Sequence, residues 1–517
     1  MDEDHMKAGV LGAAAAWPTP GTRPARRRAL ARRARRGHLV AQDNRQAAQT
    51  TAGQAVLHTD LYELTMADAA LADGTAHLPA TFEAFARNLP PGAPYGVVAG
   101  IDRAIDEICA WHFDDAQLGY LEGLGAVSPR CLDWLAGFSF SGDIVAYPEG
   151  ELWVPGSPLV TVTSTFAEGL LVETFLLSAL NHGCAIATAA AGMRRAAGPK
   201  AKLVEMGSRR SHDAAAVDSA AYAWMAGFDS TSNLGAGALY GVPTAGTSAH
   251  AWVLAHEDET EAFVAQLRAQ GPGTTLLVDT YDLLGGVRSA VCAANRLGLT
   301  GPAAVRIDSG DLTEEVGQVR GLLAELGSPG TKVTVSGDLG QEELARLSAL
   351  DGAPDAFGVG TKLVSVAPVG AVYKLVAIGA ATSPTGQWRP VSKSSTGKAT
   401  CGGRKSSWRL RDDQGRVWAE AITPEDAPAP NGAQDAKVAR DMVKAGRDVR
   451  GQTTKAARLA EARSRLGARL AELASATAPL EVVNQSAHGG TISAPPPGAQ
   501  AAHHVSIVRP AVPGQGR

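Results

Sequence analysis

Short apolar runs alternate with polar, glycine-containing loops and helical stretches between Lys202 and Ile378. The runs have the length of buried strands, and their ends fall at Met206, Val278, Ile307, Val335 and near Phe357. The later ends lie roughly 20 to 30 residues apart, which is the length of one βα unit. This rhythm predicts a parallel sheet, and the number of candidate units favours a closed parallel α/β barrel over an open Rossmann-like sheet. No GxGxxG motif follows a strand, which also counts against a dinucleotide-binding sheet.

The preceding part of the chain has the pattern of a smaller mixed α/β domain. Residues 59–71 (TDLYELTMADAAL) predict an amphipathic helix, and residues 168–182 predict a buried helix because they are apolar on most sides. Short strands are expected at residues 80–85, 95–98, 142–147 and 159–163. We expect no membrane insertion, on the expectation that no apolar run approaches the roughly 18 to 20 residues of a spanning helix.

The two ends of the chain have different compositions. Residues 1–52 combine Ala, Pro and Gly with an Arg cluster, which predicts a disordered basic arm. The expected organisation is this arm, an N-terminal mixed domain over 53–170, a barrel over 171–380, a segment over 381–450 that completes the first domain, a helix over 451–484 and a disordered tail over 485–517.

Composition excludes some partners. A net charge of -4 over 517 residues is too small to indicate nucleic acid or a membrane surface as the main partner. The five cysteines are scattered without a CxxC pair, which fits reduced thiols, so we expect a cytoplasmic protein.

Loops after the strands of a parallel barrel share one face, so their side chains form one candidate site. Glycines and hydroxyls ahead of helices favour phosphate, carboxylates can hold Mg²⁺, and arginines bind carboxylate or phosphate through paired N–H groups. Together they predict a phosphate-ester or diphosphate substrate. The candidates are Glu205, Ser208, Arg209, Arg210, Thr247, Ser248, His250, Asp279, Arg306, Asp308, Ser309, Ser336, Gly337, Asp338, Gly358, Gly360 and Thr361.

Each feature also has a purely structural interpretation. Asp311 and Asp338 can cap helices, and a lone histidine such as His250 is more often structural than catalytic. The paired Arg209 and Arg210 can pair with acids, and the glycines of the GVGT loop can merely permit a turn.

The motifs, taken as a set, resemble nicotinate phosphoribosyltransferase. TDLYELTM, EMGSRR, GTSAH, VDTYD, VRIDSGDL, GVGT, VYKL and CGGRK stand in that family's order and at similar spacing, over roughly residues 57–449. The resemblance implies a type II phosphoribosyltransferase fold, with an irregular barrel beside a domain built from both chain ends. It implies a homodimer with shared active sites. The implied reaction joins nicotinate and phosphoribosyl diphosphate, coupled to ATP hydrolysis, and gives nicotinate mononucleotide and diphosphate in NAD salvage.

The resemblance also implies roles for individual residues. His250 matches the histidine that ATP phosphorylates, and Arg306 and Asp308 match the catalytic pair at the phosphoribosyl group, with Asp308 near Mg²⁺. Tyr62 matches the aromatic that stacks on the pyridine ring from the partner subunit, and Arg209 matches the arginine that pairs with the nicotinate carboxylate. The remaining substrate-binding residues are Ser309, Asp338, Gly358, Gly360 and Thr361, and the last three match the 5′-phosphate loop. The VSGDLG sequence around Asp338 is not the family's commonest form.

Four other interpretations stay open at this point. Nicotinamide is the nearest alternative substrate, although the paired Arg209 and Arg210 favour the acid. Quinolinate is a third candidate, but that family should lack the histidine loop. A phosphate-binding aldolase-like barrel would use a Schiff-base lysine, for which Lys362 and Lys374 are candidates. A non-catalytic protein on a degenerate barrel is the fourth interpretation.

Overall fold

The computed structural model describes residues 54–380, 387–393, 400–411, 417–430, 433 and 437–473, together with the backbone of residues 480–486 and 504–510. The predicted basic arm over 1–52 lies outside the described residues.

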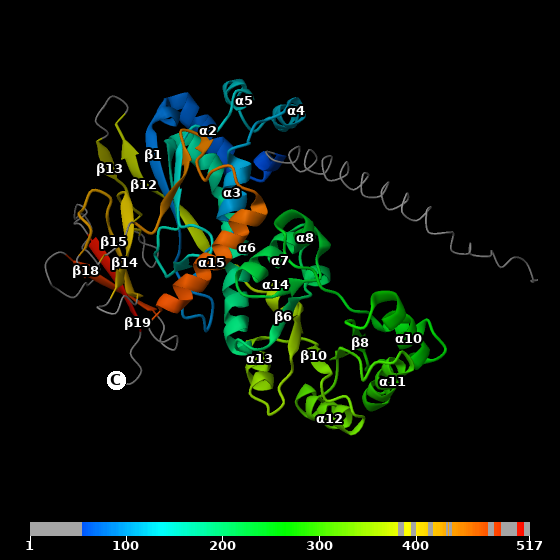
Figure 1. The fold of residues 1–517 in the computed structure, drawn as a ribbon. Coiled ribbons are helices and arrows are strands. Elements are labelled where there is room, and N and C mark those ends of the chain that lie inside the picture. Colours follow the sequence, from blue (N-terminus) through cyan, green and yellow to red (C-terminus); the bar gives the residue numbers. More distant parts are fainter. Residues whose placement is uncertain are drawn as a thin grey trace, which may run out of the picture. The chain divides into compact units, whose positions relative to one another are not determined.

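A six-stranded parallel sheet forms the centre of the second half of the chain, in the order β7-β6-β11-β10-β9-β8 (Figure 1). Its strands are β6 (Lys202–Glu205), β7 (Ser230–Thr231), β8 (Thr275–Leu277), β9 (Ala304–Ile307), β10 (Lys332–Ser336) and β11 (Ala356–Val359). This sheet confirms the parallel α/β organisation and the irregular barrel that the resemblance implies, whereas the closed barrel that the strand rhythm favours is not formed by the described strands. It is a half-barrel, because no pairing joins β7 to β8 within the described chain.

Helices follow the strands as the sequence pattern predicts. They are α7 (Ala215–Met225), α8 (Leu234–Tyr240), α9 (His250–Leu254), α10 (Glu259–Gln270), α11 (Leu283–Arg296), α12 (Leu312–Glu325), α13 (Gln341–Ser348) and α14 (Thr361–Val364). Asp311 caps α12 by accepting from the Thr313 N–H at 3.0 Å, which confirms its structural interpretation. Asp338 does not cap α13: the cap residue is Gly340, and Asp338 has a left-handed backbone with a φ of 48°.

A second, mostly antiparallel sheet has the order β13-β12-β1-β5-β3-β16-β17. Its strands are β1 (Pro79–Ala86), β3 (Asp143–Ala146), β5 (Val160–Thr165), β12 (Ala371–Gly379), β13 (Trp388–Pro390), β16 (Arg440–Lys444) and β17 (Arg447–Asp448). Strand β12 pairs with β1, although our ranges place residues 371–379 in the barrel. The barrel part therefore ends near Val364. The N-terminal part also contains α2 (Leu61–Asp73), α3 (Ile101–Ile108), α4 (Asp115–Leu124), α5 (Pro129–Ala136) and the pair β2 (Gly96–Val97) and β4 (Leu152–Trp153).

Helix α6 (Phe166–Ala197) joins the two parts. Its first half, through Ala185, packs in the core of the mixed sheet, and its second half, from Ile186, packs in the core of the barrel. By length and composition α6 could cross a membrane, so our expectation that no apolar run reaches that length was wrong. However, 67% of its most apolar stretch is buried inside the fold, which is typical of a core helix.

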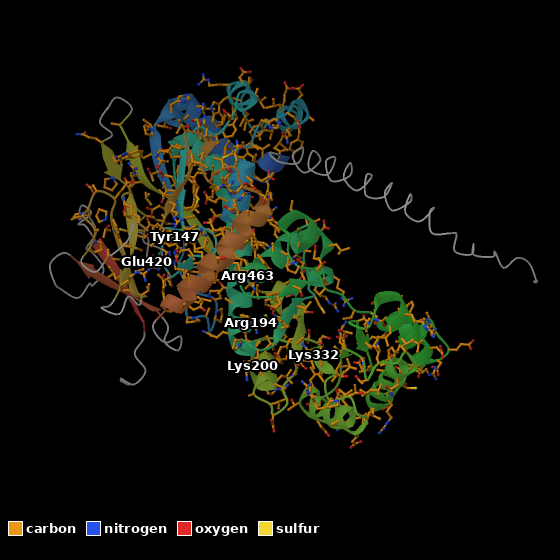
Figure 2. All side chains as sticks on the ribbon, in the orientation of Figure 1. Tyr147, Arg194, Lys200, Lys332, Glu420 and Arg463 are labelled. Atoms are coloured by element: carbon orange, nitrogen blue, oxygen red, sulfur yellow. The ribbon has the colours of Figure 1, made fainter. Side chains whose placement is uncertain are left out.

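A buried charged cluster connects the C-terminal strands to the N-terminal part. Arg409 lies in β14 (Lys405–Arg411), and Glu420 in the neighbouring β15 (Val417–Pro424). Glu420 accepts a hydrogen bond from the Tyr147 hydroxyl at 2.7 Å, and Figure 2 shows these two residues from the two segments side by side. Arg409 also contacts Glu151 at 3.2 Å.

The C-terminal helix is α15 (Lys455–Glu472), which packs on α7 and α8. Its Arg463 donates to the Phe228 carbonyl at 2.7 Å, near Arg194 of α6 (Figure 2). Two stretches of the expected disordered tail differ from that prediction. Residues 485–486 end strand β18 (Leu480–Ser486), and residues 504–510 form β19 (His504–Pro510), which pairs with β18 and β15.

Candidate active site

Arg306 occupies the centre of the site at the carboxyl edge of the parallel sheet. Arg306 is only 8% exposed. Its guanidinium donates hydrogen bonds to the Ser336 hydroxyl at 2.8 Å, to the Thr247 hydroxyl at 3.0 Å and to Asp308 Oδ1 at 2.8 Å. These partners come from β10, from the loop before α9 and from the end of β9. One buried cation therefore brings together three of the loops that the sequence places on one rim.

Two carboxylates lie beside this arginine. Asp279, after β8, accepts from the Asp308 backbone N–H at 2.8 Å and from the Ser309 hydroxyl at 2.9 Å, both through Oδ2. Its Oδ1 is buried and has no hydrogen-bond partner among the described residues. An orphaned carboxylate oxygen is costly unless a ligand completes it, so this atom indicates a binding position.

The Asp308 carboxylate is stabilised in its charged form. Burial alone would raise its pKa, but hydrogen bonds from Ser336 and Arg306 and the charges of Arg306 and His250 outweigh burial and lower the pKa below the ordinary 3.8. Asp308 is therefore an anion at neutral pH, as a metal or sugar ligand must be.

The donor set here fits Mg²⁺ bound together with a substrate. Asp279 and Asp308 offer oxygen ligands, the type that Mg²⁺ prefers. No cluster of three or more His, Cys, Asp or Glu side chains suited to a metal exists in the described parts of the chain. The remaining ligands would accordingly be water and substrate phosphates, which is how Mg²⁺ is commonly held in phosphate-transfer sites.

His250 is the first residue of α9, and its ring is half-buried. Its Nδ1 lies 3.2 Å from the Thr280 hydroxyl, and no hydrogen bond to its Nε2 is found in the part of the chain that the structure describes. The contact with Thr280 orients the ring, and in the tautomer whose Nδ1–H donates to Thr280 the Nε2 lone pair is available. Sequence reasoning missed Thr280, although its place directly after Asp279 at a strand end was a usable signal.

The side chain of Glu205 stabilises the EMGSRR loop. This buried carboxylate accepts from the Gly207 backbone N–H and from the Thr231 hydroxyl. Burial raises its pKa, and these two hydrogen bonds oppose the shift. In the same loop, Arg209 and Arg210 are exposed and form no ion pair with any described acid. The structural interpretation, in which they pair with acids, is therefore not supported.

Close packing explains two glycines at the rim. A Cβ on Gly337, whose φ is 109°, would lie 2.5 Å from the Asp308 carbonyl oxygen. A Cβ on Gly358 would lie 2.8 Å from Met206 Sδ, between β6 and β10. Gly360 precedes Thr361 at the start of α14. The structure thus places Ser309, Asp338, Gly358, Gly360 and Thr361 along the same edge as Arg306.

Tyr62 is the predicted site residue that lies away from this rim. It projects from α2, is 45% exposed and hydrogen-bonds to Glu173 of α6. Burial, followed by the charges of Glu173, Glu63 and Asp60, raises its pKa to about 12, so the hydroxyl stays protonated. No hydrogen bond joins Tyr62 to a described barrel loop of the same chain.

The Schiff-base interpretation finds no support at either lysine. Lys374 lies in β12, outside the parallel sheet, and donates to the Tyr373 carbonyl at 2.6 Å. Lys362 is exposed on α14. Neither occupies a buried position at the end of a barrel strand.

Solved structures share this architecture. Human nicotinic acid phosphoribosyltransferase is 27% identical, with a TM-score of 0.69, and the match covers 81% of this chain and 94% of that one. A nicotinate-nucleotide pyrophosphorylase from Pyrococcus furiosus has a TM-score of 0.63 at 23% identity, over 81% and 95% of the two chains, and shows the shared fold alone.

Sequence relatives agree with the fold. A nicotinate phosphoribosyltransferase of Mycobacterium tuberculosis is 45% identical over 415 residues, which is 78% of this chain and 88% of the relative. One of Bacillus subtilis is 37% identical over 68% of this chain and 73% of its own length. Models of the nicotinate phosphoribosyltransferase N-terminal domain and of the nicotinate phosphoribosyltransferase family match residues 57–181 and 201–378. The chain therefore belongs to the nicotinate phosphoribosyltransferase family.

Proposed function

We propose that the protein transfers the phosphoribosyl group of phosphoribosyl diphosphate to nicotinate and forms nicotinate mononucleotide and diphosphate for NAD salvage. One observation carries the proposal beyond family membership: buried Arg306, anionic Asp308 and the orphaned Asp279 oxygen meet at one edge of the parallel sheet. A site with one fixed cation and two carboxylates suits a metal-bound diphosphate ester.

The chemistry follows from the charge that develops in the transition state. Breaking the bond from C1 of the ribose to diphosphate creates an oxocarbenium-like sugar and an anionic leaving group. Arg306, pre-oriented by four hydrogen bonds to three loops, stabilises negative charge without having to reorganise. Asp308 stabilises the cationic sugar. The pyridine nitrogen already carries a lone pair, so no general base is required.

Mg²⁺ is the proposed metal, held by Asp279 and Asp308. When bound, it would neutralise charge on the diphosphate. Asp279 and Asp308 would orient their oxygens toward it, and the Ser309 hydroxyl and the Asp308 N–H would keep Asp279 in place.

ATP is the proposed co-substrate, and His250 the residue that it phosphorylates, which would make the enzyme an ATP-dependent ligase (EC 6.3.4.21) and a phosphoprotein. The support is geometric, because Thr280 binds Nδ1 and leaves Nε2 as the available nucleophile. His250 is also close enough to Asp308 for its charge to lower that pKa.

Nicotinate rather than nicotinamide is the proposed base. Arg209 and Arg210 are exposed cations without acidic partners in the described part of the chain, so they can bind a carboxylate. An amide would leave these charges unused. Turnover of the two bases side by side tests this assignment.

A homodimer with shared active sites is the proposed assembly. Leu61, Tyr62 and Met66 of α2 are 48%, 45% and 38% exposed, and near the rim Leu234 and Tyr281 are 77% and 65% exposed. Two exposed apolar areas of this kind indicate a protein interface. A partner's α2 would then supply the aromatic ring. We further propose a cytoplasmic location, because all five cysteines are free thiols.

The decisive experiment incubates the purified protein with nicotinate, phosphoribosyl diphosphate and Mg²⁺, with and without ATP, and measures nicotinate mononucleotide and ADP. We expect nucleotide formation that ATP accelerates. His250→Ala should lose ATP hydrolysis and keep weak synthesis. Absence of nucleotide from both nicotinate and nicotinamide would overturn the proposed reaction.

A further inference from the structure

A cavity of about 470 Å³ lies apart from the strand ends, and none of the candidate active-site residues lines it. Its walls come from residues 88–95, from one face of α6 and from residues 366–369. The α6 face contributes Ala185 and Ala189, whose small side chains leave the space open, and Gly192, against which the Gln341 side chain packs. This volume is in the range of small-molecule sites.

Arg195 and Tyr95 line this mostly apolar cavity, together with the neutral polar residues Asn88, Thr188 and Gln341. Arg195 continues the same face of α6, is exposed, and has no acidic partner within ion-pair distance among the described residues. Tyr95 is only 6% exposed, and no hydrogen bond of its hydroxyl to a described residue is found. Because Tyr95 lines the cavity, its hydroxyl can donate to a ligand atom there without giving up a bond to a described residue.

Arg195 and Tyr95 lie close enough to interact. Burial raises the pKa of Tyr95, and the charge of Arg195 opposes this shift without cancelling it. The hydroxyl therefore remains protonated at neutral pH and can donate. A guanidinium and a hydroxyl that both donate into one cavity match the two oxygens of an acid group.

We propose that this cavity binds a small organic anion. Arg195 and the Tyr95 hydroxyl hold its carboxylate, and its apolar body packs on Ala185, Ala189 and Leu89. A single cation in a mostly apolar cavity suits one negative charge on a carbon skeleton, whereas a nucleotide polyphosphate would bring more charge than Arg195 alone can neutralise.

Occupancy also has a consequence for the candidate active site. Residues 366–369 of the cavity wall follow shortly after α14, which begins directly after Gly360 of the phosphate loop. Gln341, another wall residue, begins α13 shortly after Asp338. A bound anion should therefore change the KM for phosphoribosyl diphosphate more than kcat. This second effect rests on the proposed function, whereas binding itself does not.

Calorimetry on the full chain tests the proposal with 2-naphthoate as the probe and 2-naphthylmethanol as its neutral analogue. The titration is repeated with saturating nicotinate and, separately, with the Arg209→Ala variant. Naphthoate binding that persists in both cannot be at the candidate active site. We expect saturable naphthoate binding that is at least about tenfold tighter than that of the alcohol, a difference of about 1.4 kcal/mol, because the alcohol cannot form a charge-assisted hydrogen bond with Arg195.

Variants locate the site. Arg195→Gln should weaken naphthoate binding about tenfold or more, Ala189→Leu should block it by filling the cavity, and Tyr95→Phe should weaken it several-fold. Arg268→Gln, an exposed arginine on α10, is the matched control and should leave binding unchanged. Absence of saturable binding, loss in Arg209→Ala alone, or wild-type binding in both Arg195→Gln and Ala189→Leu would overturn the proposal.

Discussion

Arg306 in the barrel and Arg409 in the C-terminal strands are both buried arginines flanked by carboxylates, but their surroundings differ. Arg409 pairs with Glu420 and Glu151, whose side chains are 0% and 2% exposed. Arg306 pairs with Asp308, which is 33% exposed.

The difference separates a structural ion-pair cluster from a functional one. Around Arg409 the acids are paired further: Tyr147 donates to Glu420, and Arg469 donates to Glu151 at 2.8 Å. Beside Arg306, a buried oxygen of Asp279 is left without a partner. Identical residue types therefore do not reveal function by themselves. The unpaired oxygen of Asp279 together with the partial exposure of Asp308 distinguishes the Arg306 site.

The largest effect on stability should come from Arg409→Met. It leaves Glu420 and Glu151 buried without their main cation, which costs about 3–5 kcal/mol of unfolding free energy. Urea denaturation measures the loss. Arg404→Met, which breaks the more exposed pair with Glu425, should cost less than about 1 kcal/mol. Equal stability of the two variants would remove the structural half of the comparison.

Arg306→Ala should act mainly on catalysis. Removal of one preorganised charge typically costs about 10² to 10³ in rate, and Asp308→Ala should lose a similar factor. Initial rates of nucleotide formation, normalised to folded protein by circular dichroism, measure the effect. Arg288→Ala, an exposed arginine on α11, should turn over normally. Wild-type rates in Arg306→Ala would contradict the assignment.

The pH dependence of stability between pH 5 and 8 should distinguish carboxylates of the two regions. Burial, then the charge of Asp102, raises the pKa of Glu149 in the N-terminal part from 4.5 to about 8, despite N–H donors and Arg450. Its proton stabilises the fold at low pH, and that stability is lost as pH rises from about 4.5 through 8. Unfolding free energies of wild type relative to Glu149→Gln should fall across this window.

Asp308→Asn is the reference for this experiment. Because the fold lowers the pKa of Asp308, its contribution is present above the ordinary 3.8 and lost only as pH falls further. Wild type relative to this variant should show no slope between pH 5 and 8. A falling slope there would contradict the description of the site.

Thr280→Val should give the smallest effect. It removes the hydrogen bond that orients His250 and keeps the side-chain shape, so ATP hydrolysis should fall about 2- to 10-fold, as expected for one hydrogen bond of about 0.5–1.5 kcal/mol. Thr274→Val, at an exposed contact with Gln270, is the control. Unchanged hydrolysis in Thr280→Val would show that the ring is oriented by other groups.

Most of the barrel could be predicted from the sequence because buried parallel strands are continuous apolar runs. The same property explains the misplaced β12: Ala371–Gly379 is as apolar as a barrel strand, and only pairing with β1 assigns it to the other sheet. The end of α6 was also missed, since the small residues that continue it to Ala197 have no strong periodic pattern.

Residue types at the rim were predictable, but their connections were not. The strand ends identified Arg306, Asp308 and Asp279 as neighbours. Which oxygen lacks a partner, and that Thr280 contacts His250, depend on side-chain geometry that spacing does not specify. Tyr62 stays a prediction because its proposed role needs a second chain.

Helix α6 has a mechanical consequence. This helix is continuous over 32 residues and packs in both hydrophobic cores, so no loop interrupts it between the two parts. A rotation of the mixed-sheet part relative to the barrel would require α6 to bend or break. If the barrel were expressed alone with α6, the half of this helix that packs in the core of the mixed sheet would be exposed to water, so we expect the fragment to aggregate.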